Sequence, residues 1–221
     1  MSAEKNIAIL MADLTGYTAM TEVHGSLSAA TMVEKYLELA AKAMFGNSRL
    51  LERVGDQLVI VSESADDVTH TALRLLEHTS AENNFLHIHA GLHYGPVLEQ
   101  SGSFYGTSMN ITARIAALAK RNSILCSIDF TKSVSTPSEF FFNKIGEVKL
   151  KNIKSPIALA ELLPAAKHIL SQKQVDPVCH MVVDAETSRR SAYHGATYYF
   201  CSEECLNIFQ DNPEQVLQHP S

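Results

Sequence analysis

The first three quarters of the chain alternate between the two-residue spacing of apolar positions typical of strands and the three- or four-residue spacing typical of helices. An apolar run over 7–12 predicts a first strand, and Gly55-Asp56 between two apolar segments predicts a hairpin. Gly95-Pro96 is expected to interrupt a strand over 85–93. This order predicts an α+β fold with helices on one face of a sheet. The other expected elements are helices over 26–45, 65–79 and 107–120 and strands over 123–127, 140–151 and 157–163.

The pattern changes after Leu163-Pro164. A polar stretch over 167–174 resembles the tail of a helix or a linker, and short segments with closely spaced cysteine, histidine and aromatic residues follow from Val175. We therefore predict a larger domain over 1–168 and a small module over 175–217.

Composition excludes several classes of protein. The 221 residues are 46% hydrophobic and 19% charged, and the net charge of -6 with no basic run argues against nucleic-acid binding. No apolar stretch approaches the roughly 18 residues needed for a membrane span. The N-terminus lacks the pattern of a secretory signal, so we expect a cytoplasmic protein that binds neither nucleic acid nor membrane.

The four cysteines fall into two groups. Cys126 follows Ile124 and Leu125, so we interpret it as a buried structural thiol. Cys179, Cys201 and Cys205 all lie in the last fifth of the chain, and in a reducing compartment such clustering indicates metal binding more than disulfides.

Two acidic residues stand at strand ends. Asp13 closes the first apolar strand, and Asp56 lies at the tip of the hairpin. If the hairpin lies beside the first strand, the two carboxylates meet at one edge of a sheet and can hold two divalent cations about 3.5–4 Å apart. Taken singly, each acid is more often simply part of an ordinary turn.

Five segments in order resemble the class III nucleotidyl cyclases, the adenylate and guanylate cyclases, over about residues 5–163. The resemblance implies the ferredoxin-like catalytic domain of that family. The segments are Ala12-Asp13-Leu14-Thr15-Gly16-Tyr17-Thr18, Arg53-Val54-Gly55-Asp56, Gly91-Leu92-His93-Tyr94-Gly95-Pro96-Val97, the helix carrying Asn110 and Arg114, and Gly146-Glu147-Val148-Lys149-Leu150-Lys151.

The resemblance implies a role for each matching residue. Asp13 and Asp56 hold two Mg²⁺ or Mn²⁺ ions, which activate the ribose 3′-hydroxyl and neutralise the leaving pyrophosphate. Asn110 orients the ribose, and Arg114 meets the charge that develops on the α-phosphate. Lys151 binds the triphosphate, with Lys149 and Lys154 as alternatives.

The family also implies an assembly. Each active site forms between two subunits, with the aspartates from one and the asparagine and arginine from the other. Because this chain carries both halves, we expect a homodimer with two equivalent sites.

Two positions bear on whether the substrate carries adenine or guanine. Where ATP-specific members of the family carry Lys and Asp, this chain has Glu52 and Ser103. A glutamate accepts hydrogen bonds from guanine N1 and its exocyclic amine, and a serine donates to O6, which slightly favours GTP over ATP. The rival interpretation is that Glu52 is an exposed strand residue and that selectivity for the purine is loose. For the protein as a whole, the alternative to an active cyclase is a catalytically degenerate domain that binds nucleotide or dimerises within a metal-responsive regulatory protein.

The C-terminal segment resembles the YHS domain, a metal-associated module akin to treble-clef-like units. Roughly forty residues bury little core, so bound metal would add folding energy. Zn²⁺ or another heavy metal would be held by Cys179, Cys201 and Cys205, with His180 and His194 as candidates for a fourth ligand. The competing interpretation is three packed thiols in a fold held by aromatic residues.

His87, His89 and His93 recur on one face of a predicted strand. Because apolar residues alternate with them, we interpret this face as solvent-facing or as an interface rather than a metal site.

Overall fold

The computed structural model describes residues 4–164 and 173–218, and the chain divides into two compact units. The first comprises Met1–Asp13, Lys42–Leu76 and Ile88–Ala165, and the second comprises Leu14–Ala41, Glu77–His87 and Ala166–Ser221. The domain boundaries given above, 1–168 and 175–217, stay a prediction.

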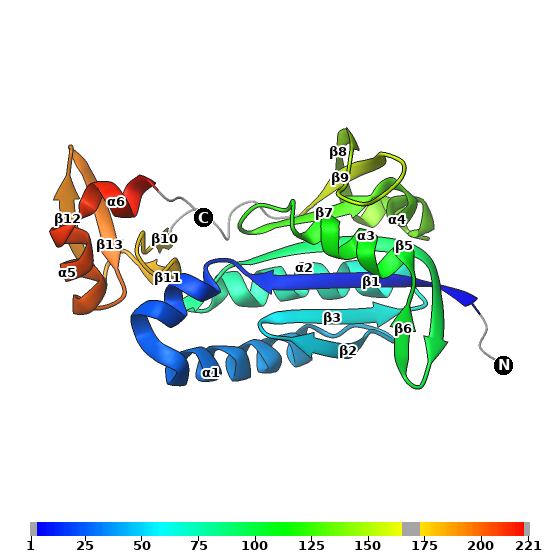
Figure 1. Ribbon diagram of the computed structural model, residues 1–221, viewed down its shortest axis with the longest axis horizontal. Helices are drawn as coiled ribbons and strands as arrows, with labels where there is room; N and C mark the ends of the chain where they lie inside the picture. The colour runs from blue at the N-terminus through cyan, green and yellow to red at the C-terminus, as the bar shows by residue number, and fades with distance from the viewer. Residues whose placement is uncertain (1–3, 165–172, 219–221) are drawn as a thin grey trace. The chain divides into compact units, whose positions relative to one another are not determined.

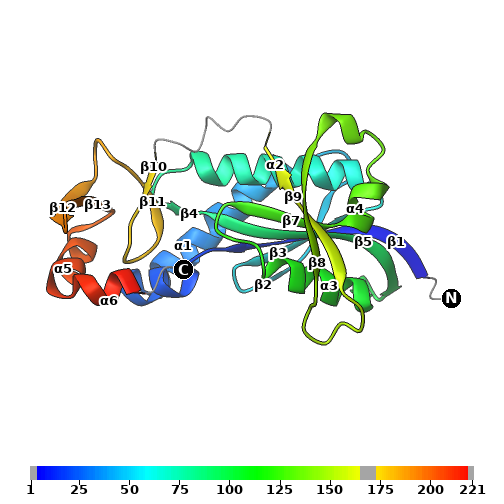
Figure 2. The ribbon, with the colours of Figure 1, turned by 90° about the horizontal axis from the view of Figure 1, so that it is seen from above.

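An eight-stranded sheet forms the first unit, with the strand order β2-β3-β1-β5-β7-β9-β8 and β6 paired to β5 (Figure 1). β5 and β7 are parallel, whereas β1–β3, β2–β3, β5–β6, β7–β9 and β8–β9 are antiparallel. β8 and β9 form a long hairpin at one edge (Figure 2). The strands are β1 (Glu4–Leu14), β2 (Arg49–Val54), β3 (Gln57–Ser62), β5 (Ile88–Gln100), β6 (Ser103–Tyr105), β7 (Ser123–Ser127), β8 (Phe141–Val148) and β9 (Ile157–Leu163).

Helix α3 (Thr107–Ala116) covers one face of this sheet. Side chains alternate between faces along a strand, so Ile7, Ile9 and Met11 share a face, and they pack in one cluster with Ala116. Met109 and Ala113 pack against the same cluster. This packing fixes which face of α3 is buried and leaves the opposite face exposed.

The remaining helices of the first unit pack around the sheet. α2 (Ala65–Ala81) begins in the first unit and ends in the second, and α4 (Ile128–Ser133) lies against β5, β7 and β9. α4 starts where the Ser127 hydroxyl accepts a hydrogen bond from the amide of Phe130, which is a standard N-cap. A 3₁₀ turn follows over Pro137–Glu139.

We expect Asp66 to stabilise the loop after α4 in a pH-dependent way. Its carboxylate accepts hydrogen bonds from the amides of Ser135 (2.8 Å) and Thr136 (2.9 Å) and from the Thr136 hydroxyl (2.7 Å). Burial raises the pKa of Asp66, but these hydrogen bonds outweigh it, so the pKa lies below its ordinary value of 3.8.

A carboxyl with a lowered pKa contributes stability above its ordinary pKa and loses it as pH falls through the folded-state pKa. Asp66→Asn should therefore cost about 1 kcal/mol near neutral pH, discounted for solvent screening. The difference from the parent should shrink as the pH falls below the ordinary value of 3.8. Urea unfolding at several pH values measures this, with Glu77→Gln on the same helix as the control. An Asn variant as stable as the parent at pH 7 would contradict the expectation.

The second unit contains most of α1 (Tyr17–Ala43), β4 (Phe85–Leu86) and the C-terminal elements. β11 (Met181–Asp184) pairs with both β10 (Lys173–Val175) and β4, and β12 (Arg189–Tyr193) pairs with β13 (Ala196–Phe200). α5 (Glu203–Asp211) and α6 (Pro213–Gln218) follow. A small aromatic core of Tyr198, Phe200 and Phe209 joins β13 to α5.

The predicted α+β class is confirmed, but α2 and α3 lie on opposite faces of the sheet (Figure 2), so the expectation of helices on one face is wrong. Two local expectations are also wrong, and one helix was not foreseen. α1 starts at Tyr17 rather than at residue 26, because it consists of two helical pieces joined at Gly25 (φ 77°, ψ 171°). β5 continues through Pro96, which lies between the stretches paired to β7 and to β6. α4 was not expected. In the part of the chain that the structure describes, no helix has the length and apolar character needed to cross a membrane.

Candidate functional site

Asp13 near the end of β1 and Asp56 in the turn between β2 and β3 lie at the same end of the sheet. Ala12 of β1 is the partner of Leu58 in β3, so Asp13 follows that pair directly and Asp56 lies in the turn just beyond it. Gly55 has φ 63°, which allows the two-residue turn that carries Asp56. Both aspartates are half-buried.

His89 on β5 adds a third polar group at this place. Its Nε2 lies 3.9 Å from Asp13 Oδ2. Burial lowers the pKa of His89, and the nearby charge of Asp56 works in the opposite direction. His89 therefore lies within electrostatic range of both carboxylates.

The histidine face of β5 is covered by the protein itself, so the interpretation of a solvent-facing strand is wrong. A Cβ added at Gly91 would lie 2.3 Å from the Ala116 amide nitrogen of α3. His93 is 5% exposed, and its Nδ1 lies 2.8 Å from the Ser127 hydroxyl that caps α4. His93 is thus a packed core histidine.

Asn110 and Arg114 lie on the exposed face of α3, four residues apart and therefore on one side of the helix. Close contact between α3 and β5 at Gly91 fixes their position along the sheet. The N-terminal end of α3 is held by the Ser108 hydroxyl, which donates to the Pro96 carbonyl (2.8 Å).

The other three predicted substrate residues come from separate elements. Glu52 lies on the edge strand β2, Ser103 begins β6, and Lys151 lies in the turn between β8 and β9. All three are exposed.

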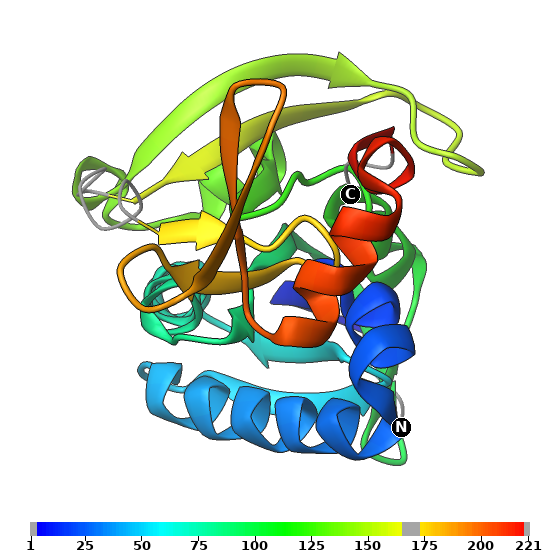
Figure 3. The same cartoon turned by 90° about the vertical axis from the view of Figure 1, so that its left-hand side faces the viewer.

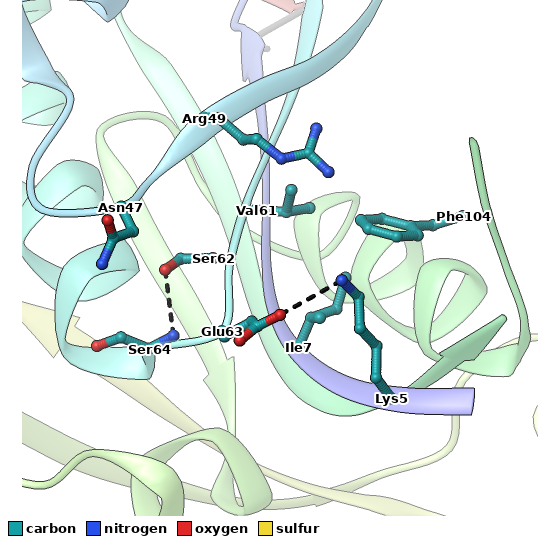
Figure 4. A pocket seen from close by; sticks show the side chains of 9 residues that line it. All are labelled: Lys5, Ile7, Asn47, Arg49, Val61, Ser62, Glu63, Ser64 and Phe104. Carbon is teal, nitrogen blue, oxygen red and sulfur yellow. Dashed lines mark hydrogen bonds and ion pairs between the residues drawn. The ribbon is translucent and has the colours of Figure 1, made fainter. Parts of the chain in front are cut away.

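A cavity of about 490 Å³ opens at the other end of β1, lined in part by Lys5, Arg49 and Phe104 (Figure 4). The Lys5 ammonium lies 2.9 Å from Glu99 and 3.4 Å from Glu63. Eight residues of extended strand, roughly 26 Å, separate Lys5 from Asp13. This cavity is therefore distinct from the place where the two carboxylates lie.

The three C-terminal cysteines converge within the second unit. Cys179 lies in the turn before β11, Cys201 follows β13, and Cys205 lies in the first turn of α5. The sulfur of Cys201 is 3.4 Å from that of Cys179 and 3.6 Å from that of Cys205. Hydrogen bonds from the thiols of Cys179 and Cys205 lower the pKa of Cys201.

His24 of α1 joins the same cluster. Its Nε2 lies 3.5 Å from the Cys201 sulfur and 3.7 Å from the Cys205 sulfur. The four ligand atoms all lie within 4.8 Å of one another, whereas neither His180 nor His194 belongs to the group. Figure 3 shows the first part of α1 beside α5.

Asp176 organises the backbone around the cysteines. Its buried carboxylate accepts hydrogen bonds from the amides of Val178 (2.8 Å), Cys179 (3.4 Å) and Cys201 (2.8 Å). Burial raises the pKa of Asp176, and the hydrogen bonds from the Cys201 and Val178 amides partly offset this effect. One carboxylate thus joins the two loops that carry Cys179 and Cys201.

Cys126 is fully buried, and its thiol donates to the Ala160 carbonyl, as expected of a structural cysteine. Burial raises its pKa to about 12, so it stays a thiol at neutral pH.

Sequence reasoning missed His24 and His89. For His89, the available signal is the glycine two residues further along the same strand face, because a glycine on a strand can mark the close approach of another backbone. Nothing in the local sequence links His24 to cysteines 177 and 181 residues away.

Two family models match the chain. The adenylate and guanylate cyclase catalytic domain matches residues 1–162, and the YHS domain matches residues 174–219.

Curated relatives resemble the first part of the chain. An uncharacterized protein of Mycobacterium tuberculosis is 28% identical over 165 residues, covering 73% of this chain and 42% of the relative. A pH-sensitive adenylate cyclase of the same species is 22% identical over 158 residues, covering 70% and 40% respectively. The chain therefore spans about two fifths of the length of these relatives.

Solved cyclases share the fold. An adenylate cyclase of Trypanosoma brucei in its monomeric state superposes with a TM-score of 0.67 at 16% identity, covering 73% of this chain and 89% of the other. The guanylyl cyclase Cya2 superposes with a TM-score of 0.65 at 18% identity, covering 76% and 96%. Together with the family model over 1–162, this shows that the chain belongs to the adenylate and guanylate cyclase family and carries a YHS domain after the cyclase domain.

Proposed function

We propose that the protein is a nucleotidyl cyclase that converts a purine nucleoside triphosphate to its 3′,5′-cyclic monophosphate and pyrophosphate. The observation that carries this proposal is the placement of Asp13 and Asp56 at one end of adjacent strands, beside His89. Carboxylate oxygens are the ligands that Mg²⁺ and Mn²⁺ prefer, so the donor set fits hard divalent cations.

Asp13 and Asp56 would hold two such ions, which supply charge neutralisation at the phosphates and activation of the 3′-hydroxyl. Asn110 would hold the ribose in the orientation that in-line attack requires. Arg114, whose planar guanidinium offers several donors at once, would bind the α-phosphate oxygens as their charge grows. Lys151 would bind the terminal phosphates as a point charge.

We propose further that two copies of the chain complete each site. Asn110 and Arg114 lie on an exposed helix face, where a partner's substrate can reach them. Large apolar side chains are exposed on the same unit at Val54 (62%), next to the hairpin tip, and at Tyr105 (54%), just before α3. A second copy packed on this surface would cover both side chains.

A catalytically degenerate domain is the alternative. Incubation of the purified chain with Mn²⁺ and either ATP or GTP, with cyclic product measured by mass spectrometry, separates the two. Turnover of either nucleotide supports the enzyme, and binding without product under all conditions supports the degenerate domain.

The preference for one purine can be tested by exchanging the residues at positions 52 and 103. The pair Glu52 and Ser103 favours guanine by hydrogen-bond complementarity, whereas several curated relatives are named adenylate cyclases. We expect GTP to be preferred, and the double variant Glu52→Lys/Ser103→Asp to shift the ratio of kcat/KM toward ATP by about 10-fold or more. Arg53→Lys, next to Glu52 on the strand, serves as the control. An unchanged ratio in the double variant would show that these residues do not read the base.

A further inference from the structure

The cluster of His24, Cys179, Cys201 and Cys205 has the dimensions of a metal coordination shell. A tetrahedral Zn²⁺ with bonds of about 2.3 Å to sulfur and 2.0–2.1 Å to nitrogen has sulfur–sulfur edges of about 3.8 Å and sulfur–nitrogen edges of about 3.5 Å. The observed sulfur–sulfur separations are 3.4 and 3.6 Å, and the sulfur–nitrogen separations are 3.5 and 3.7 Å.

Disulfide formation and apolar packing both fit the cluster less well than metal binding. The sulfurs are too far apart for a disulfide bond, which is about 2.05 Å long, and all three thiols are free. Simple apolar packing does not account for a histidine nitrogen aimed at two sulfurs from a helix far away in sequence. Cys₃His is a ligand set of structural zinc sites, which are closed by four protein ligands.

We propose that His24 of α1 is the fourth ligand of a zinc site whose other ligands are Cys179, Cys201 and Cys205. The cyclase region of the chain thus completes the metal site of the YHS region. The carboxylate of Asp176 supports the site from outside, because it fixes the backbones of Cys179 and Cys201.

The local sequence around His24 fits this role. His24 is the last residue before Gly25, where α1 breaks in a backbone conformation that only glycine adopts readily. The break ends the first helical piece at His24, and α1 resumes beyond it. Gly25 therefore sets where the imidazole lies.

The zinc site is also connected to the end of β1. The ring of His180, which follows Cys179, packs so closely on Gly16 that an added Cβ there would lie 2.7 Å from His180 Cβ. Gly16 lies three residues after Asp13, and the intervening Thr15 amide is bonded to the His87 carbonyl (2.8 Å). Bound zinc would fix His24 and Cys179, and with them the start of α1 and, through His180, the turn that follows Asp13. Zinc loading should therefore raise cyclase activity. This last step rests on the proposed function.

Metal binding is tested on the full chain without any activity assay. Apoprotein titrated with Co²⁺ should bind one equivalent at this site and show the visible absorption of a tetrahedral cobalt–thiolate centre. His24→Ala should weaken Co²⁺ binding by about 100-fold or more. His24→Cys should retain tetrahedral binding with stronger sulfur-to-cobalt absorption, and His194→Asn should behave like the parent.

Two results would overturn the proposal. One is a parent chain that binds no Co²⁺ or Zn²⁺ under reducing conditions. The other is a His24→Cys variant whose Co²⁺ absorption spectrum equals that of the parent, because residue 24 is then not a ligand. This second test does not depend on whether His24→Ala folds.

The coupling to catalysis has its own measurement. With Mg²⁺ in excess, removal of zinc by a zinc-selective chelator should lower the cyclase rate by about 10-fold, and zinc should restore it. His24→Ala should show the low rate with or without zinc. An equal rate for zinc-loaded and zinc-free parent contradicts the coupling, whereas no turnover in any sample, with Co²⁺ binding intact, contradicts only the proposed function.

Discussion

Replacing Asp56 with asparagine should reduce cyclase turnover by at least about 100-fold. The change keeps the shape of the side chain but removes the charge that a hard cation requires. Since Asp56 lies in an exposed turn and is only half-buried, the fold should persist. Asp13→Asn should have the same effect, because we propose that both carboxylates hold the same pair of ions.

The measurement is the rate of cyclic nucleotide formation over a range of Mn²⁺ concentrations, with thermal unfolding as the check of folding. Asp129→Asn provides a matched control on an exposed carboxylate of α4 in the same unit. A folded Asp56→Asn protein with the turnover of the parent would exclude metal binding by this hairpin.

Gly91→Ala should destabilise the first unit by about 3 kcal/mol and reduce turnover at the same time. The added Cβ would lie 2.3 Å from the amide nitrogen of Ala116 and 2.7 Å from the carbonyl oxygen of Thr112. Both are backbone atoms, so no side-chain rotation relieves the clash, and α3 must move away from β5. Asn110 and Arg114 lie on α3 and would move with it.

Gly95→Ala, on the same strand, should destabilise the protein less than Gly91→Ala. There the nearest atom is the Ser108 hydroxyl oxygen at 2.6 Å, which can rotate away at the loss of one hydrogen bond. Chemical unfolding should therefore rank Gly91→Ala well below Gly95→Ala in stability. Equal stability of the two variants would mean that α3 is free to shift, contrary to the packing described.

Much of the fold follows from local sequence. The strand that ends near Asp13 and the Gly55-Asp56 turn are short-range features, and β7 and β9 fall where alternation predicts them. The spacing of Cys201 and Cys205 likewise predicts their approach, because residues one helical turn apart lie on one side of a helix start.

Contacts between residues far apart along the chain could not be predicted from the sequence. His24 lies before Gly25, where the apolar spacing is lost, so the helix was expected to begin only after it. His93 lies on a strand face that looked polar, but α4 and its Ser127 cap bury it. In both cases the deciding contact joins residues far apart along the chain, which periodicity does not report.

We propose that two copies of this chain build each active site, with the aspartates from one and the arginine from the other. Asp13→Ala and Arg114→Ala proteins should each be inactive alone. In an equal mixture of exchanging subunits, half of the dimers are mixed and each holds one intact site, so about a quarter of the parent activity should return. Absence of any recovery, with subunit exchange verified by native mass spectrometry, would contradict the account.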